Sequence, residues 1–354
     1  MKRVLILSPY PFGTAGSQRF RYEQYLDILE SNNIHYKHQS FLDENTWKIL
    51  YKPGNGLKKI SGILNGFLRR FWQLLRLSPY DFIFIHREAA PIGPPVFEWI
   101  IAKLWNKKVI YDFDDAIWLE NTTETNLIAS IIKFPQKVGW ICRWSYKASV
   151  GNQYLAEYAS KHAKNVFINP TTIDTENLHY PNSYQNTKTV IGWTGTHSTL
   201  KYLEMVKKIL INLKKKYDFE VRIIADKEPH SFIKDIEFKA WDKETEIEDL
   251  NQIDIGIMPL TDDIWAKGKC GFKALQYMAL EKPVLASPVG VNTQIVDEGK
   301  SGFLCISEED WKSNLQKLLE SKSLRQEMGK YGRSKVIQEY SVSSNSNNFL
   351  SLFQ

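Results

Sequence analysis

The sequence is poor in cysteine, and the cysteines it has form no recognisable site. Cys142, Cys270 and Cys305 are scattered over 354 residues with no CxxC or Cys/His spacing. Such usage is typical of a reducing compartment and indicates no structural zinc. The seven histidines likewise show no HxxxH or carboxylate-paired spacing. We therefore expect no metal site.

Long apolar runs are missing as well. Only Val4–Leu7 separates the basic N-terminus from Ser8-Pro9, which is too short for the apolar core of a signal peptide. No run approaches the length of a transmembrane helix. We therefore expect a cytoplasmic protein. A hydrophobic share of 43% predicts packed cores, and 354 residues are enough for two domains.

Three loop motifs that mark common enzyme classes are absent. The first strand ends in a glycine-containing loop, Ser8–Ser17, but this loop is no GxGxxG fingerprint, which argues against a simple dehydrogenase. There is no Walker loop and no GxSxG motif either. A glycine-containing loop after a first strand is still what an α/β domain offers a ligand, and Gly13 is the candidate residue there.

Positive charge is concentrated at one end of the chain. Residues 1–80 hold 12 Lys and Arg against 5 Asp and Glu, whereas the remainder holds 34 against 35. Such a basic region fits nucleic acid, anionic lipid or a phosphorylated acceptor. Because the sequence has no RNP-like aromatic pair and no Arg/Lys repeat, we expect no nucleic acid partner.

Short apolar strands alternate with helical periodicity along most of the chain. We expect strands at Val4–Leu7, Asp81–His86, Lys108–Asp114, Val190–Trp193, Phe219–Ala225, Ile253–Pro259 and Pro283–Ala286. Alternation of this kind predicts parallel sheets with helices on both faces.

The most informative segment is Trp265–Ser287, which joins a glycine-containing loop to a helix and then to a buried strand. Backbone N–H groups of Gly271, Phe272 and Lys273 are expected in the open first turn, where the helix dipole and the unpaired donors favour a diphosphate. The residues Ala274, Leu275, Met278 and Ala279 supply the apolar face of the helix.

This segment resembles the nucleotide-sugar site of the family-4 (group 1) retaining glycosyltransferases. The family pattern is a Glu, a glycine-rich helix start, a second Glu eight positions on, then Ala-Met-Ala and Pro-Val-Val-Ala. Aligned on Met278-Ala279, the second Glu falls on Gln276 and the first on Gly268, so neither carboxylate is present. The second Glu binds the donor ribose in the family, and the amide of Gln276 can both accept and donate hydrogen bonds in its place.

The resemblance implies the GT-B fold, an α/β arrangement of two Rossmann-like domains with parallel sheets facing a cleft. Asn169–Pro181 resembles the family's interdomain linker. The implied domains are 1–170 on the acceptor side, a linker at 171–187, a nucleotide-sugar domain at 188–335, and a C-terminal helix at 336–354 that crosses back.

The implied activity is transfer of a sugar from a nucleotide donor to an acceptor hydroxyl, with retention, in cell-surface polysaccharide or glycolipid assembly. The family needs neither metal nor cofactor, and the departing phosphate helps to deprotonate the acceptor, so no dedicated nucleophile is expected. Two alternatives stay open. One is a nucleotide-sugar epimerase or hydrolase, and the other is a non-catalytic nucleotide-sugar-binding partner, which the loss of both glutamates suggests.

Further donor-site candidates follow from the same resemblance. Gly192–Lys201 occupies the place where the family has a loop with an Arg and a Lys on the diphosphate; here Thr196 and Ser198 either contact phosphate or cap a helix. Trp241 lies either at the donor base or in the core. The loop Gly192–Lys201 also contains the candidates Thr194, Gly195 and His197. The cation that neutralises the diphosphate is expected to be one of Lys201, Lys267, Lys269 or Lys273.

The N-terminal part contributes candidates for the reacting sugar and the acceptor. Asp114 and Asp115 follow a buried strand, where they either act on sugar or acceptor hydroxyls or cap the next helix. Arg87 and Glu88 follow the preceding strand and are expected in the cleft. At the start of the first helix the dipole opposes cations, so Arg19 and Arg21 either bind an acceptor phosphate or are solvated.

Residues 57–77 read as an amphipathic helix with basic flanks. The apolar stripe of this helix consists of Leu57, Ile60, Leu64, Phe67, Phe71 and Leu74. The stripe is widened by Ile63, Leu68, Trp72 and Leu75. The cations of the helix are Lys58, Lys59, Arg69, Arg70 and Arg76. Such a helix either packs on the N-terminal sheet or lies on an anionic bilayer. We expect the bilayer, which favours a lipid-linked acceptor over a soluble one and a peripheral location on the inner face of the plasma membrane.

Overall fold

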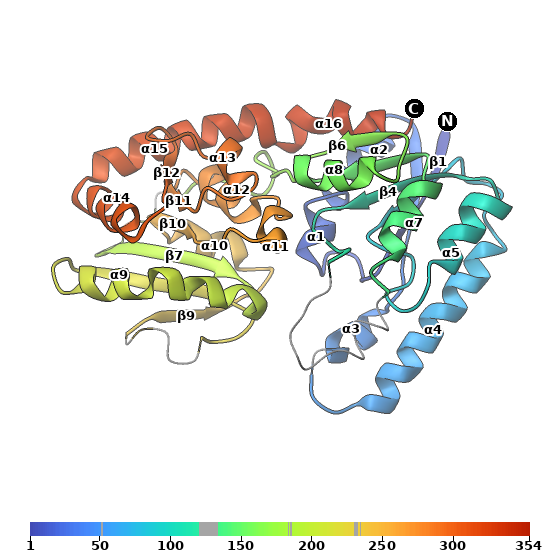
Figure 1. The fold of residues 1–354 in the computed structure, drawn as a ribbon, viewed down its shortest axis with the longest axis horizontal. Coiled ribbons are helices and arrows are strands. Elements are labelled where there is room, and N and C mark those ends of the chain that lie inside the picture. The colour runs from blue at the N-terminus through green and yellow to red at the C-terminus, as the bar shows by residue number, and fades with distance from the viewer. Residues whose placement is uncertain (51, 120–133, 183, 185, 230–232, 234) are drawn as a thin grey trace. The chain divides into compact units, whose positions relative to one another are not determined.

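The computed structural model describes residues 1–354 except 51, 120–133, 183, 185, 230–232 and 234. The chain divides into two compact units. Unit 1 comprises Met1–Thr171 and Ser346–Gln354, and unit 2 comprises Thr172–Asn345, so the boundary falls within helix α16 (Val342–Ser351). Each unit is built on one six-stranded parallel sheet with helices around it (Figure 1). The predicted α/β class with parallel sheets is confirmed.

The sheet of unit 1 has the strand order β2-β1-β3-β4-β5-β6. The order changes direction between β1 and β3, and in open parallel sheets such a point is where ligands bind, at the carboxyl ends of the strands. Val4–Leu7 of β1 is almost fully buried, as expected for a strand covered on both faces. The strands are β1 (Lys2–Ser8), β2 (Ile34–Ser40), β3 (Phe82–His86), β4 (Lys108–Phe113), β5 (Lys147–Val150) and β6 (Val166–Ile168).

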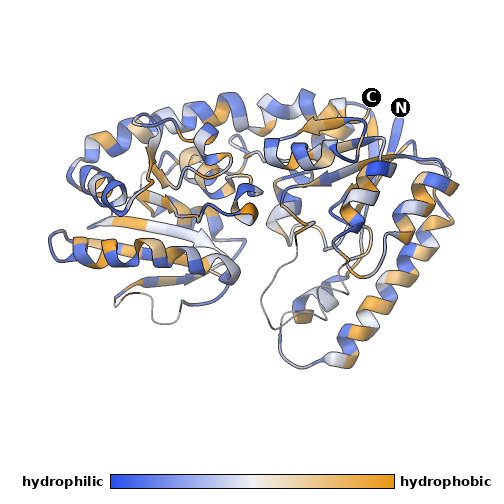
Figure 2. Ribbon diagram, in the orientation of Figure 1, coloured by the Kyte–Doolittle hydropathy of each residue, from blue (hydrophilic) through white to orange (hydrophobic). Residues whose placement is uncertain are grey.

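Short helices surround this sheet, and α4 is the longest of those described. Hydrophobic and hydrophilic residues alternate along α4 (Figure 2). The end of α16 packs on the same sheet, because the Phe349 ring lies 6.1 Å from that of Phe84 in β3, measured between centroids. Phe349 also stacks on Tyr25 of η1, with the ring centroids 4.3 Å apart. The helices are α1 (Gly16–Arg19), η1 (Glu23–Tyr25), α2 (Leu26–Ser31), α3 (Glu44–Leu50), α4 (Gly56–Leu74), α5 (Val96–Trp99), η2 (Ile100–Leu104), α7 (Lys137–Trp144) and α8 (Gln153–Ser160).

The sheet of unit 2 has the order β12-β11-β10-β7-β8-β9, with its change of direction between β10 and β7. Its strands are β7 (Thr189–Gly195), β8 (Phe219–Ala225), β9 (Glu237–Ala240), β10 (Ile255–Met258), β11 (Val284–Ala286) and β12 (Gly302–Leu304). Its helices are η3 (His197–Leu203), α9 (Glu204–Lys214), α10 (Glu246–Asn251), α11 (Ile264–Lys267), α12 (Phe272–Ala279), α13 (Asn292–Ile295), α14 (Glu308–Glu320), α15 (Lys322–Lys335) and η4 (Val336–Tyr340).

Helix α12 is fixed against the carboxyl end of β7. Gly256 of β10 leaves room for the Tyr277 ring, since a Cβ there would lie 2.3 Å from that ring. The Tyr277 hydroxyl in turn accepts a hydrogen bond from the Thr194 N–H at 2.8 Å. The first turn of α12 and the last residues of β7 are therefore held side by side.

None of the helices in the described part of the chain is long and apolar enough to cross a membrane.

Candidate functional site

The first turn of α12 forms the centre of the candidate donor site. Gly271 caps the helix with a left-handed backbone, φ 67°, which favours glycine. A Cβ at Gly271 would also lie 2.1 Å from Ile295 Cδ1, so α13 leaves no space for a side chain. Phe272 and Lys273 begin the helix and are half-buried. The predicted loop-to-helix geometry is present.

Lys273 points from α12 to the end of β7. Its ammonium lies 4.1 Å from the centroid of the Trp193 ring and 3.5 Å from Thr199 Oγ1. Gly195 permits this approach, because a Cβ there would lie 2.7 Å from Lys273 Nζ. Burial, and then the charge of Lys269, lower the pKa of Lys273 well below its ordinary value.

Two other candidate lysines face acidic residues. Lys267 Nζ lies 3.2 Å from Asp262 Oδ1, and both side chains are largely exposed. Burial raises the pKa of Asp263, but hydrogen bonds from Thr261 and the backbone, and then the charge of Lys201, outweigh it and lower that pKa below its ordinary value. The Lys201 ammonium lies 5.2 Å from the Tyr202 ring centroid. Lys269 is half-buried on the loop before Gly271.

Gln276 is buried and already has a partner inside unit 2. Its amide nitrogen donates to Glu246 Oε1 at 3.2 Å, and Glu246 opens α10. Both residues are at most 5% exposed. A carboxylate therefore lies beside the position where the family has its ribose-binding Glu, but it comes from another helix.

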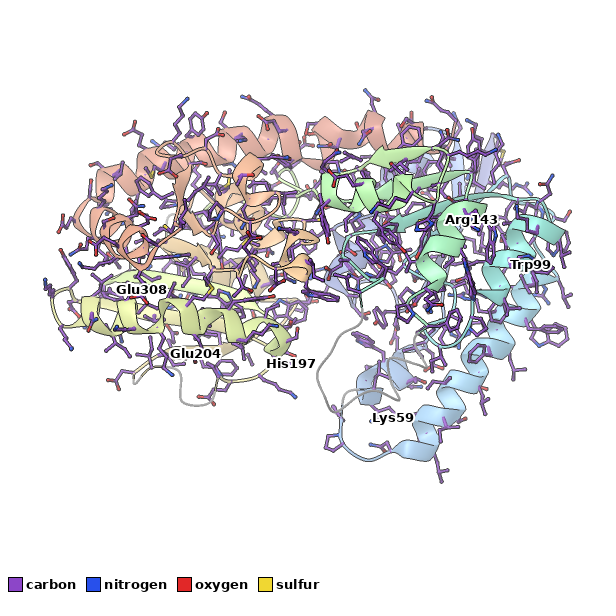
Figure 3. The ribbon with its side chains drawn as sticks, in the orientation of Figure 1. Lys59, Trp99, Arg143, His197, Glu204 and Glu308 are labelled. Carbon is purple, nitrogen blue, oxygen red and sulfur yellow. The ribbon has the colours of Figure 1, made fainter. Side chains whose placement is uncertain are left out.

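The loop after β7 is ordered by its own polar groups. The Thr196 N–H donates to Thr199 Oγ1 at 3.2 Å, and the Thr196 and Ser198 hydroxyls lie 2.9 Å apart. Thr196 is therefore the N-cap of η3, and Ser198 lies in the first turn of η3. His197, labelled in Figure 3, contacts Asp226 through both its backbone N–H and its ring Nδ1.

Two remaining donor candidates have backbone roles. Trp241 follows β9, is half-buried, and donates from its backbone N–H to Ala225 O at 2.9 Å. Gly13 has a left-handed backbone, φ 73°, and donates from its N–H to Glu23 Oε2 at 2.9 Å.

In unit 1, two polar pairs stand at the carboxyl ends of β3 and β4. Arg87 binds Asp114 through Nε and Nη2, at 2.9 and 2.7 Å. Burial lowers the pKa of Arg87, but the charges of Asp114 and Asp115 outweigh it and raise the pKa above its ordinary value. Glu88 pairs with Lys137 at 2.6 Å. These side chains come together, as expected of loops at one sheet edge.

Backbone strain marks the same place. Arg87 has a left-handed backbone, φ 59°, which costs free energy in a residue with a Cβ. The Tyr111 hydroxyl donates to Arg87 O at 2.7 Å and helps to hold this conformation. Asp115 Oδ1 accepts from the Ala116 N–H at 3.0 Å, which is a local turn contact.

Arg21 has its anionic partner inside unit 1. Its guanidinium contacts Asp112 and the carbonyl oxygen of Asn169, and its side chain is fully buried. Although burial favours the neutral acid, Arg21 and His86 hold the pKa of Asp112 well below its usual range. The pairing with Asp112 explains why an arginine stands at the start of this helix, where the dipole opposes cations. Arg21 is therefore not available to bind an acceptor phosphate. Arg19 is 9% exposed, with its guanidinium 4.9 Å from the Phe20 ring centroid.

Sequence reasoning missed Glu246 and Trp193. Glu246 is one of several acids in Asp242–Asp249, and nothing in its spacing distinguishes it. Trp193 could have been suspected, because it stands next to the candidate Thr194 in a predicted strand. Among the described residues, no group of three His, Cys, Asp or Glu is arranged to hold a metal ion.

Comparisons with known proteins agree with this geometry. Residues 181–335 match the family model of the glycosyl transferases group 1. No curated protein matches the chain significantly. Sucrose-phosphate synthase from Thermosynechococcus elongatus is 12% identical, with a TM-score of 0.73 over 100% of this chain and 98% of its own.

Two further structures are similar over almost their whole lengths. HepE of Anabaena, solved in complex with UDP-glucose, is 14% identical with a TM-score of 0.65, and both chains are covered completely. A glycosyltransferase from Rickettsia africae is 13% identical with a TM-score of 0.64, over 99% of this chain and 98% of its own. The predicted GT-B fold is confirmed by these matches. Residues 181–335 match the group 1 glycosyl transferases, on a chain that has the GT-B fold over its full length.

Proposed function

We propose that the protein transfers a sugar from a nucleoside diphosphate sugar to an acceptor hydroxyl. The observation that carries the proposal is the first turn of α12, which brings backbone N–H donors and the Lys273 ammonium to the carboxyl end of β7. A helix N-terminus with an adjacent cation suits a diphosphate. The family match over residues 181–335 supports the same activity.

UDP is the first nucleotide to test, because HepE was solved with UDP-glucose. The departing UDP gains negative charge as the glycosidic bond breaks, and fixed N–H donors and a lysine stabilise that charge without a metal. Retention, as in family 4, needs no enzyme nucleophile, because the departing phosphate can take the acceptor proton from the same face. The donor site offers the Lys273 ammonium and the first turn of α12, which suit this chemistry.

The Arg87–Asp114 pair is the proposed acceptor-side element of unit 1. Asp114 is 15% exposed and Arg87 25% exposed, so both retain access to solvent. Both Arg87 nitrogens donate to Asp114 Oδ1. A carboxylate held in place by two such bonds can accept hydrogen bonds from sugar hydroxyls without reorganising. Arg19 remains a candidate for an acceptor phosphate, whereas Glu88 serves mainly to hold Lys137.

We further propose that α4 lies on a membrane and that the acceptor is lipid-linked, in polysaccharide or glycolipid assembly at the inner face of the plasma membrane. One face of α4 packs on unit 1 through Gly62, Gly66, Arg70 and Leu74. The other face exposes a row of large apolar side chains to solvent: Leu57, Ile60, Leu64, Leu68, Phe71, Trp72 and Leu75. A row of this kind with an interfacial Trp suits the headgroup region of a bilayer.

The apolar face extends beyond α4. Phe67 stacks on Phe97, so α5 lies beside α4, and α5 adds the exposed Trp99. Figure 3 labels Trp99 and Lys59 on these two helices. The expected contribution of Arg70 is wrong, because its guanidinium is buried against Ser8 O, Gln39 and Ala89 O. Insertion of apolar side chains, more than charge, therefore drives the proposed binding.

A second candidate function is donor binding without transfer, which the pairing of Gln276 with Glu246 and the absence of both family glutamates favour. The test is incubation of UDP-, GDP- and dTDP-sugars with and without a lipid-linked acceptor fraction, with donor loss and product measured by mass spectrometry. Product that needs the acceptor supports transfer. Loss of donor without acceptor indicates a hydrolase or epimerase, and donor binding with no turnover indicates a non-catalytic partner.

A further inference from the structure

We propose that Lys273 is the cation that holds the donor diphosphate, supplied from α12 in place of the arginine that the family carries in the loop after β7. This inference rests on the proposed function and names the residue that performs one of its steps. It also explains how the loop Gly192–Lys201 can lack an arginine.

The position of the ammonium is the first argument. Lys273 starts in the first turn of α12, yet its tip lies under the last residues of β7, beside Trp193 and Gly195. Thr199 Oγ1 is 3.5 Å from it, on the first turns of η3. The charge thus lies where the phosphate-binding loop is expected, between that loop and the first turn of α12.

The second argument is the absence of an acidic neighbour. Among the described residues, no carboxylate lies within ion-pair distance of Lys273. Its ammonium contacts the indole ring of Trp193 and the hydroxyl of Thr199. Lys267, by contrast, has Asp262 at 3.2 Å. A half-buried ammonium without a counterion lowers the stability of the protein. The position of Lys273 is therefore better explained by ligand binding than by a contribution to folding.

Trp193 explains how the ammonium is held without being neutralised. An aromatic face attracts a cation through its quadrupole but contributes no net charge. The positive charge therefore remains available to an anion arriving at the loop. Burial and the charge of Lys269 both lower the pKa of Lys273, because both disfavour an ammonium that has no anionic partner. A diphosphate would supply that partner.

The matched variants are Lys273→Met, which keeps the length and apolar stem of the side chain, and Lys282→Met as the control. Burial also lowers the pKa of Lys282, but this lysine follows the opposite end of α12. Calorimetry measures the affinity of each for UDP and for uridine, which lacks the diphosphate. We expect Lys273→Met to weaken UDP roughly 10- to 100-fold, the range for a lost charged hydrogen bond. The binding of uridine to Lys273→Met, and the binding of UDP to Lys282→Met, should change little.

The thermal unfolding midpoint without ligand separates a ligand-binding lysine from a structural one. We expect Lys273→Met to unfold at the same temperature as the wild type or higher, because it removes an uncompensated charge. Equal UDP affinity in the wild type and Lys273→Met, or a lowered midpoint with equal losses for UDP and uridine, overturns the inference alone. A wild-type protein that binds no nucleoside diphosphate overturns the proposed function itself.

Discussion

The side-chain amide of Gln276 donates a hydrogen bond to the carboxylate of Glu246, with Nε2 and Oε1 3.2 Å apart inside unit 2. The pair joins α12 to α10 and is almost fully buried. The amide nitrogen is thus committed to the protein, which leaves the amide oxygen as the atom that can accept from a ribose hydroxyl. We propose that this amide and carboxylate together take the place of the single Glu of the family.

This pairing predicts that Gln276→Glu, the family residue, is harmful here. The substitution places two carboxylates in contact, and like charges at this distance cannot both ionise in a buried site. We expect UDP affinity and the unfolding temperature to fall, and to fall further from pH 6 to pH 8 as the shared proton is lost.

The exchanged pair Glu246→Gln with Gln276→Glu is the control, since it restores one amide and one carboxylate. Calorimetry should show partial recovery of UDP binding, whereas Gln276→Ala should lose about 1–2 kcal/mol, the cost of an unmade buried hydrogen bond. If Gln276→Glu binds UDP as well as the wild type at pH 8, Glu246 does not control this position.

The features that could be predicted from the sequence are those whose residues lie close together along the chain. The start of α12 was predictable, because Gly271, the apolar face after it and the strand after Pro283 lie within one short segment. The pairing of Gln276 with Glu246 could not be predicted, because 30 positions separate the two residues and only the packing of α10 on α12 brings them together.

The amphipathic helix shows the same limit. Periodicity predicted α4, but α4 has apolar residues on two sides, and periodicity does not say which side packs. Phe67 and Leu74 turn inward, whereas Leu64 and Leu68 face solvent. Arg70 is buried because the backbone carbonyls of Ser8, at the end of β1, and Ala89, after β3, accept from its guanidinium, an arrangement that arises only in the folded unit.

A further prediction is that Asp114→Asn impairs sugar transfer more than it impairs folding. The variant keeps the shape but removes the charge that Arg87 binds at 2.7 Å. We expect a stability loss of about 1–2 kcal/mol, between the values for exposed and buried ion pairs, and a much larger loss of turnover. Asp115→Asn serves as the comparison, because Asp115 makes a local turn contact. Wild-type turnover in both variants with the true acceptor would show that these carboxylates are structural.

The buried pair of Arg21 with Asp112 predicts a pH-dependent stability effect. Arg21→Met leaves a buried carboxylate without its main counter-charge, which costs about 3–5 kcal/mol near neutral pH. The pKa of Asp112 is lowered in the folded protein, so the stability from this pair is present above the ordinary Asp pKa and is lost as the pH falls. Urea unfolding should therefore show a large gap between wild type and Arg21→Met at pH 7 and a smaller gap at pH 3. Arg76→Met, at an exposed arginine, should show no gap at either pH.

The exposed face of α4 predicts membrane binding that depends on apolar side chains. Leu64 and Leu68 stand one turn apart and are each more than half exposed, so Leu64→Glu with Leu68→Glu should leave the unfolding temperature unchanged. Burying such a side chain in the headgroup region contributes about 1–2 kcal/mol. We therefore expect the double variant to lose roughly tenfold or more in co-sedimentation with anionic vesicles.

Two controls separate this effect from charge and from general surface polarity. Ile211→Glu with Ile306→Glu changes two exposed isoleucines of unit 2 by the same charge and should leave vesicle binding intact. High salt should weaken wild-type binding only in part, because Lys58 is exposed whereas Arg70 is buried and Arg69 is bound to Asp43. Complete release by salt would make charge the main force. A wild-type protein that stays in the supernatant at low salt would remove the membrane role of α4, and with it the reason to favour a lipid-linked acceptor over a soluble one.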